Sequence, residues 1–191
     1  MERNIYQEQW LNRVPEVKYI DQSHYPFYYA FELKNVLFIA LDASVVGHLS
    51  KNQYTWLKNI LEEAKGKYRQ RITFSHLPIW PFSVKWEKEI IGDPALETLL
   101  QQHDVSLYLS GHHHAFYLGY KEGIIHVSQA CLGSGLRNYI GTSQRSRQGY
   151  TLIDIDVSNK IHNNAYETPD LTKTVDFTRL PEKIKSQYAL L

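Results

Sequence analysis

Three apolar runs of strand length alternate with two helical segments along the first 110 residues of the chain. Val36–Leu41 is apolar at every position, which is the pattern of a strand buried on both faces of a sheet. A helix is predicted to begin after Ser50, because Ser50 and Gln53 have the spacing of a capping box, and to end at Gly66. This alternation predicts an α/β fold with the apolar strands in the middle of a sheet.

The same rhythm repeats further along the chain. Ile72–Phe74 predicts a short buried strand, and Val105–Ser110 predicts another. Between them, Asp93 and Pro94 occupy the N-cap and first position of a second predicted helix. The segment 77–92 is rich in aromatic residues and has no clear period, so we expect a long loop there.

Outside this central part the pattern indicates antiparallel strands. The predicted strands are residues 25–33, 36–41, 115–120, 124–130, 150–157 and 161–167, after a short helix and a loop in residues 1–24. The chain should therefore form a mixed sheet with antiparallel strands toward its C-terminus. We expect one domain over residues 1–167, followed by an extended tail over residues 168–191 that packs loosely or on a neighbour.

The composition excludes several kinds of partner. The chain has 21 Lys and Arg against 20 Asp and Glu, so its charge of +1 creates no long-range field for nucleic acid. Its single cysteine, Cys131, allows neither an intramolecular disulfide nor a cysteine-rich zinc site. No stretch approaches the roughly 18 apolar residues of a membrane span, and no signal peptide is recognisable. We expect no nucleic-acid partner and no membrane span. The sequence does not indicate a cellular compartment.

Three of the nine histidines are candidate metal ligands. His76 directly follows one predicted buried strand, and His112 and His114 directly follow another. In an extended segment residues two apart point the same way, so His112 and His114 should face one locus while His113 faces away as a bystander. Neighbouring strand ends of an open α/β sheet converge, and three imidazoles suit Zn, Mn, Fe or Co better than Ca or Mg. The pattern therefore predicts a transition-metal site.

These histidines lie in two short motifs. The first is the H-L-P of TFSHLPIW, which begins at His76, and the second is the G-H-H-H of LYLSGHHHAF, which begins at Gly111. In their order and strand context they resemble the calcineurin-like metallophosphoesterases, in particular the purple-acid-phosphatase-like branch. The segments YYAFEL, NVLFIALDA and VSQACLGSG fit as well, so the resemblance covers roughly residues 25–156.

The resemblance implies a fold, a set of ligands and a reaction. The fold would be the C-terminal part of a four-layer αββα sandwich. His76 and His112 would bind one metal of a dinuclear centre of Mn, Fe or Zn, and His114 would bind the other. A metal-bridging hydroxide would then attack a phosphoester substrate, as in a phosphatase or phosphodiesterase.

Three further motifs of the family, D-x-H, G-D-x-x-D and G-N-H-[DE], do not occur in residues 1–75. They supply the bridging aspartate, the remaining ligands and the acid–base histidine, so no catalytic residue is assigned in this chain. Asp42 lacks the required neighbours and is expected to be a loop or capping residue. The chain thus resembles the C-terminal half of such an enzyme. Without a carboxylate to bridge two dications, we expect any metal it binds alone to be single or weakly held.

Three explanations stay open at this point. The chain is a fragment of a longer enzyme, or it is completed by a chain or upstream segment that carries the missing motifs. It is otherwise a catalytically incomplete relative that acts as a metal-binding or interaction module.

Several other residues have two readings each. Arg137 and Arg145 follow a loop of small residues and are candidates to bind the substrate phosphate, with ordinary exposed surface as the alternative. Trp80, Phe82 and Trp86 either wall a substrate pocket beside the first histidine or cap the core. H-x-H with a distant third histidine also occurs in the three-histidine zinc sites of carbonic anhydrases and in cupin barrels. Those folds are mostly β, and the two predicted helices argue against them.

Overall fold

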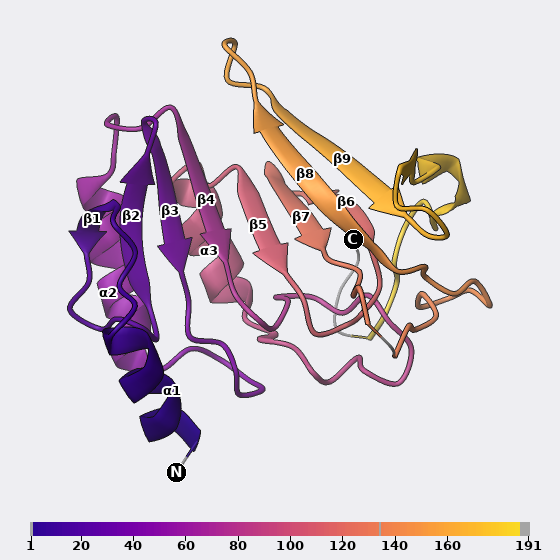
Figure 1. Cartoon of the computed structure of the whole chain (residues 1–191), viewed down its shortest axis with the longest axis horizontal. Coiled ribbons are helices and arrows are strands. Elements are labelled where there is room, and N and C mark those ends of the chain that lie inside the picture. Colours follow the sequence, from indigo (N-terminus) through magenta and orange to yellow (C-terminus); the bar gives the residue numbers. More distant parts are fainter. Residues whose placement is uncertain (1, 134, 188–191) are drawn as a thin grey trace.

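A seven-stranded sheet forms the centre of the computed structural model, which describes residues 2–133 and 135–187 (Figure 1). Its strands are β1 (Lys18–Asp21), β2 (Tyr29–Leu33), β3 (Val36–Ala40), β4 (Gln70–Phe74), β5 (Leu107–Ser110), β6 (Tyr117–Lys121) and β7 (Ile124–Ser128). They are hydrogen-bonded in the order β1-β2-β3-β4-β5-β7-β6. A second sheet has the order β10-β9-β8, with β8 (Gly149–Ile155), β9 (Ile161–Glu167) and β10 (Lys173–Thr174).

The large sheet is mixed, as predicted. Strands β3, β4, β5 and β7 pair in parallel, whereas β1, β2 and β6 join them in antiparallel fashion. The parallel register places Ile39 beside Thr73 and Thr73 beside Tyr108, so the ends of β3, β4 and β5 lie at one edge of the sheet. Loops that leave these three strands therefore meet at this edge.

The helices are α1 (Glu2–Leu11), α2 (Lys51–Glu63), α3 (Pro94–Gln102) and the short 3-10 helix η1 (Phe177–Arg179). Helices α2 and α3 begin where the sequence predicts, whereas the short helix in the C-terminal segment was not predicted. The Ser50 hydroxyl accepts a hydrogen bond from the backbone amide of Gln53, and Asp93 caps α3 in the same way through Ala95. Only half of the predicted capping box forms, because the Gln53 amide group instead bonds the backbone of Asp42. Gln53 thereby ties α2 to the loop after β3.

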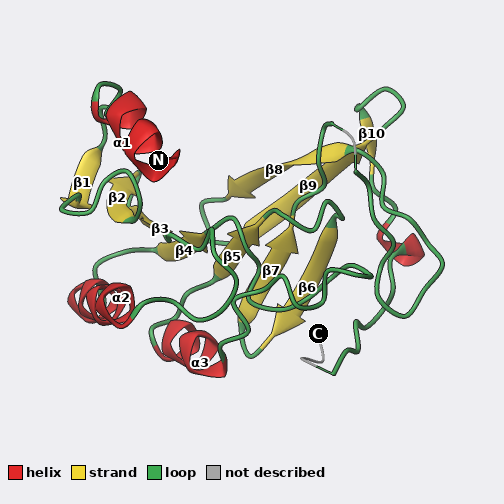
Figure 2. Ribbon diagram, turned by 90° about the horizontal axis from the view of Figure 1, so that it is seen from below, coloured by secondary structure: helices red, strands yellow, loops and turns green. Residues whose placement is uncertain are grey.

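The helices and the small sheet lie on opposite faces of the large sheet. Figure 2 shows α2 and α3 on one side, and β8 and β9, together with α1, on the other. Between α2, α3 and the sheet lies the main core, where Leu37, Ile39, Leu57, Leu61 and Leu100 are fully buried. Burying these side chains stabilises the α/β layer by roughly 1.5–3 kcal/mol each.

The second face of the sheet is covered over only part of its width. Ile153 and Ile155 of β8 pack with Leu107 and Val127, which covers the side of β5 and β7. On β3, however, Phe38 is partly exposed although its neighbours along the strand are fully buried. The predicted burial of this strand on both faces is therefore complete only on the helical side.

Two local predictions need correction. Strand β1 was not predicted, because its four residues are only partly buried and show no clear alternation. The predicted strand from residue 25 begins at Tyr29, because a turn with a cis Tyr25–Pro26 bond precedes it.

In the segment 168–187, strand β10 pairs with β9, and Ile184 is buried in the main core. Residues 188–191 lie outside the described part. Within the described residues, no helix is long and apolar enough to cross a membrane.

Candidate metal centre

His76 and His112 meet at the edge where β4 and β5 end. The two strands are parallel neighbours, and the Gly111 amide donates a hydrogen bond of 3.0 Å to the backbone carbonyl of His76. This contact holds the two loops together, so that Nε2 of His76 lies 2.9 Å from Nδ1 of His112. The structure thus brings together two of the three predicted ligands, which are separated by 36 positions in the sequence.

The G-H-H-H segment is not extended, contrary to prediction. His112 and His114 have φ angles of 59° and 46°, in the left-handed region that is uncommon for residues with a side chain. The chain has to turn here from β5 toward β6, which runs antiparallel to β7. The two imidazoles are therefore placed by a tight turn and not by the alternation of a strand.

His114 lies in the same turn after β5, and its ring contacts the loop after β7 at Gly135. Its Nδ1 is buried and has no hydrogen-bond partner among the described residues. Gly135, with a φ of 91°, packs against this ring so closely that a Cβ atom there would lie 3.0 Å from Nδ1. Burial, followed by the charge of His114, lowers the pKa of His76. Burial and then His76 lower the pKa of His112, so neutral imidazoles with available lone pairs are favoured at this edge.

His113 is an anchor between β5 and the loop 77–92. Its ring is fully buried, accepts a hydrogen bond from the Phe82 amide at Nδ1 and donates one from Nε2 to the Glu89 carbonyl. Burial lowers the pKa of His113 to about 4, so the ring is neutral at physiological pH. The middle histidine of the motif is thus a bystander toward the metal locus but a structural link to Glu89.

Of the three aromatic residues considered in that loop, two are part of the core and one lies beside the candidate metal site. Trp80 and Phe82 are buried in the main core. Trp86 instead lies against His112, with ring centroids 5.0 Å apart in an edge-on arrangement, and the Arg137 guanidinium stacks 3.5 Å from its ring. Trp86 and Arg137 therefore border the histidine pair.

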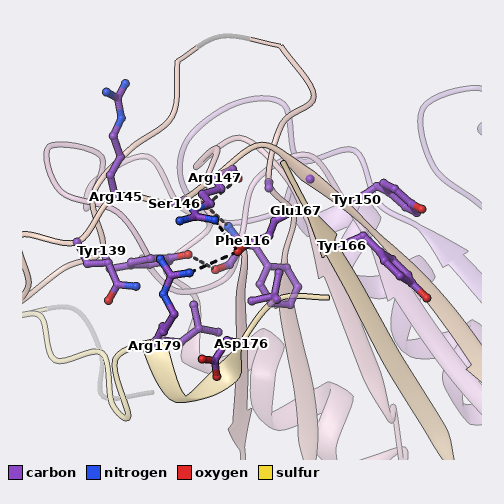
Figure 3. Close-up of a pocket in the computed structure, with 15 residues that line it drawn as sticks. Phe116, Tyr139, Arg145, Ser146, Arg147, Tyr150, Tyr166, Glu167, Asp176 and Arg179 are labelled. Atoms are coloured by element: carbon purple, nitrogen blue, oxygen red, sulfur yellow. Dashed lines mark hydrogen bonds and ion pairs between the residues drawn. The ribbon is translucent and has the colours of Figure 1, made fainter. Parts of the chain in front are cut away.

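The side chains of the two candidate phosphate-binding arginines have different surroundings, although the backbone of Arg145 pairs with Asn138, next to Arg137. Arg137 is beside Trp86, and its Nη1 is buried with no hydrogen-bond partner among the described residues. Arg145 lines a small cavity of about 20 Å³ elsewhere, where Arg147 and Arg179 both contact the Glu167 carboxylate. In Figure 3, Arg145 extends away from that ion-pair cluster. Only Arg137 lies within reach of the histidines.

The residues present fit part of a metal centre. His76 and His112 offer a convergent pair of nitrogens, and a buried nitrogen of His114 has no other partner. In residues 2–133 and 135–187, however, no three His, Cys, Asp or Glu side chains are grouped so that they could hold a metal ion. Asp42 follows β3, as expected of a loop residue, and its carboxylate is paired with Arg3 at 2.6 Å.

A cavity of about 400 Å³ adjoins His76. It lies between α1 and the ends of β2, β3 and β4, and its wall includes Tyr6, Phe27, Phe74 and His76. The Arg3–Asp42 ion pair lies at the same cavity. The partly exposed face of the large sheet, which includes Phe74, therefore adjoins the candidate metal site at this cavity.

One residue of the site was missed by sequence reasoning. The Glu89 carboxylate lies 3.5 Å from Nε2 of His112. It is in a loop with no hydrophobic period and belongs to no recognisable motif, so nothing in the local sequence marks it. Its position depends on contacts with a distant strand end.

Comparison with known proteins agrees with this geometry. The profile of the calcineurin-like phosphoesterase family matches residues 2–116, which is more than half of the chain. Comparison with curated proteins gave no match.

Two similar solved structures share the fold. Purple acid phosphatase PPD1 from yellow lupin has a TM-score of 0.59 at 16% identity, over 78% of this chain and 32% of that one. GAP50, the anchor in the inner membrane complex of Plasmodium, has a TM-score of 0.53 at 18% identity, over 78% of this chain and 52% of that one. The chain thus spans about a third to a half of the length of these structures. By its fold and by the matching profile, the chain belongs to the calcineurin-like phosphoesterase family.

Proposed function

We propose that this chain takes part in metal-dependent phosphoester hydrolysis and supplies His76, His112 and His114 to a dinuclear centre of Mn, Fe or Zn. The observation that carries the proposal is the 2.9 Å separation between Nε2 of His76 and Nδ1 of His112. Two nitrogens that bind one metal at about 2.0–2.1 Å each lie roughly 3 Å apart, so the metal-free geometry is already close to that of a bound pair. Little reorganisation would be needed on binding.

The chemistry of the surrounding residues is compatible with a phosphoester. When bound, the metals would polarise the phosphoryl group and lower the pKa of an attacking water. Arg137 carries a positive charge beside Trp86, which lies against His112, and its buried Nη1 has no partner among the described residues, so a phosphate oxygen can satisfy it. The stacked Trp86 limits the directions in which that guanidinium can turn.

The centre also needs carboxylate ligands, and in residues 2–133 and 135–187 no Asp or Glu is grouped with the histidines so that together they could hold a metal ion. Two dications a few ångströms apart repel strongly, and neutral imidazoles do not offset that repulsion. Asp42 lines the same cavity as His76, but its carboxylate is paired with Arg3 and its backbone amide donates to Gln53 of α2. We therefore propose that the missing acidic ligands come from another polypeptide segment, either upstream or in a separate chain. The alternative function is a metal-binding or interaction module without catalytic activity of its own.

The large sheet has a surface on which such a segment can lie. Phe31 and Phe38 stack with ring centroids 5.1 Å apart on the partly exposed face, and Phe74 continues this surface to the cavity beside His76. Strand β8 is the edge of the small sheet and is its nearest strand to β3 and β4 in both views (Figures 1 and 2). A further strand added to β8 would cover this part of the face in the same way as β8 and β9 cover the part over β5 and β7.

The proposal is tested with the purified chain and added Zn²⁺ or Mn²⁺. We expect no more than one weakly bound metal per chain by calorimetry, and no turnover of 4-nitrophenyl phosphate. His112→Ala should weaken binding by about tenfold or more, since it removes half of the convergent pair, whereas the exposed His48→Ala should leave it unchanged. Equal binding by all three forms would contradict the metal assignment. Turnover that requires two metals per chain would show that the chain supplies a complete centre and needs no second segment.

A further inference from the structure

The two ring nitrogens of His112 face different partners. Nδ1 lies 2.9 Å from His76, whereas Nε2 lies 3.5 Å from Oε2 of Glu89 on the opposite edge of the ring. Trp86 approaches the same ring edge-on, which limits its rotation. The orientation of the imidazole is therefore defined from three sides.

A neutral imidazole carries one N–H, and only the other nitrogen can bind a metal. Nε2 of His112 is buried, and no described residue satisfies it at full hydrogen-bond geometry, so a proton there needs an acceptor nearby. The Glu89 carboxylate is the acceptor within reach. Its side chain is 43% exposed, and hydrogen bonds at catalytic sites are often long in the ligand-free protein and tighten on binding.

The backbone of Glu89 is held in place independently of its carboxylate. Its carbonyl accepts the hydrogen bond from Nε2 of His113 at 3.0 Å, and its amide donates to the Trp86 carbonyl at 2.9 Å. His113 in turn is held by the Phe82 amide. The middle histidine of the motif thus holds the loop so that a carboxylate lies beside the first one.

We propose that Glu89 is a positioning residue, which accepts the Nε2 proton of His112 and leaves Nδ1 of that ring as the metal-binding atom next to His76. The inference rests on the function proposed above. In the metal-free chain the proton arrangement that follows is continuous: Nε2–H of His112 donates to Glu89, and Nε2–H of His76 donates to Nδ1 of His112. To bind a metal through Nε2, His76 would need its proton on Nδ1, whereas His112 would already have the metal-binding tautomer.

The tautomers are read directly by nitrogen NMR of the metal-free chain labelled with ¹⁵N-histidine, at pH 7.5. We expect His112 in the Nε2–H form in the wild type, and a mixture of both forms in Glu89→Ala. Glu89→Gln, which keeps a weaker acceptor oxygen, should fall between the two. Glu87→Ala, which removes a carboxylate from the same loop, is the matched control and should leave the His112 signals unchanged.

Zn²⁺ affinity, measured by calorimetry, is the second readout. An outer carboxylate that orients a ligating histidine is worth about 10- to 100-fold in metal affinity, so Glu89→Ala should lose at least about tenfold and Glu89→Gln less. An Nδ1–H tautomer of His112 in the wild type would overturn the inference. So would an unchanged tautomer together with unchanged affinity in Glu89→Ala. If the wild type binds no Zn²⁺, the proposed function fails, but the metal-free tautomers still decide the role of Glu89.

Discussion

Nε2 of His76 lies 2.9 Å from Nδ1 of His112 because parallel pairing of β4 with β5 brings their ends together. Both histidines lie just after their strands and not within them. The contact is made by two loops, which are joined by the hydrogen bond from the Gly111 amide to the His76 carbonyl. The spacing of the pair therefore depends on the large sheet and on the backbone hydrogen bonds that join the two strand ends, which include that from the Ser75 amide to the Leu109 carbonyl.

Replacing Gly135 by alanine should disturb the third histidine. The new Cβ would lie 3.0 Å from Nδ1 of His114, and the φ of 91° is unfavourable for alanine by about 1 kcal/mol or more. We expect a lower unfolding free energy and a loss of metal affinity of up to about tenfold, measured by denaturant titration and calorimetry. Gly133→Ala is the matched control, because a Cβ there meets nothing within 4 Å. Equal effects of the two variants would mean that His114 is not constrained by this loop.

Exchanging the two arginines for glutamine should separate their roles. Arg137 stacks on Trp86 next to the histidines, whereas the Nε of the neighbouring Arg145 donates to the Leu136 carbonyl and its side chain lines the cavity at Glu167. Arg137→Gln should weaken binding of inorganic phosphate to the Zn²⁺-loaded chain by about tenfold, the usual loss of one charged hydrogen bond. Arg145→Gln should change it less than twofold. A larger effect from Arg145 would move the phosphate site away from His112.

Replacing His113 by phenylalanine should destabilise the fold although it preserves an aromatic ring. The variant leaves the Phe82 amide without its acceptor and the Glu89 carbonyl without its donor, both in a buried setting. We expect a loss of about 1–3 kcal/mol in the free energy of urea unfolding. The exposed His48→Phe should stay within about 0.5 kcal/mol of the wild type. An unchanged stability in His113→Phe would show that the loop is held by other contacts.

Acid should remove the stabilising contribution of Glu97. Burial by itself would raise the pKa of this carboxyl, but hydrogen bonds from His126, Lys121 and Trp80 outweigh it and lower the pKa below its usual value. A carboxyl with a lowered pKa in the folded state stabilises at neutral pH, and this stability is lost as the pH falls through the folded-state pKa. Glu97→Gln should therefore cost about 2 kcal/mol at pH 7.

The pH dependence distinguishes this effect from simple loss of packing. The difference in unfolding free energy between wild type and Glu97→Gln should shrink as the pH is lowered from 5 to 3, measured by urea denaturation. Glu62→Gln, on the exposed side of α2, is the control and should show a difference near zero at each pH. A constant difference for Glu97→Gln would mean that its charge does not contribute.

Much of the fold was predictable from local patterns. Strands β3 and β5 form within the predicted ranges Val36–Leu41 and Val105–Ser110. A short continuous apolar run is typical of a strand that is buried on both faces of a sheet. The caps at Ser50 and Asp93 mark the starts of α2 and α3 because a helix start needs an acceptor for its free amides. These features depend on neighbours a few positions away, so the sequence alone is sufficient to predict them.

The conformation of the histidine segment was decided by tertiary structure. The sequence places His112 and His114 after a strand, but the left-handed backbone at both follows from the turn toward β6 and from the burial of His113. The location of Glu89 beside His112 likewise depends on a hydrogen bond between residues 24 positions apart. Loop conformations of this kind are set by long-range contacts, which leave no periodic signal in the chain.

Sequence by itself thus determined which residue types arrive at the strand ends, since strand periodicity and capping are local effects. It also determined that strand β3 has apolar side chains for two faces. Only the tertiary structure decided which imidazole nitrogens meet, which carboxylate stands behind them, and that Phe38 remains partly exposed. These outcomes depend on the packing of distant segments against one another, and local sequence places no constraint on that packing.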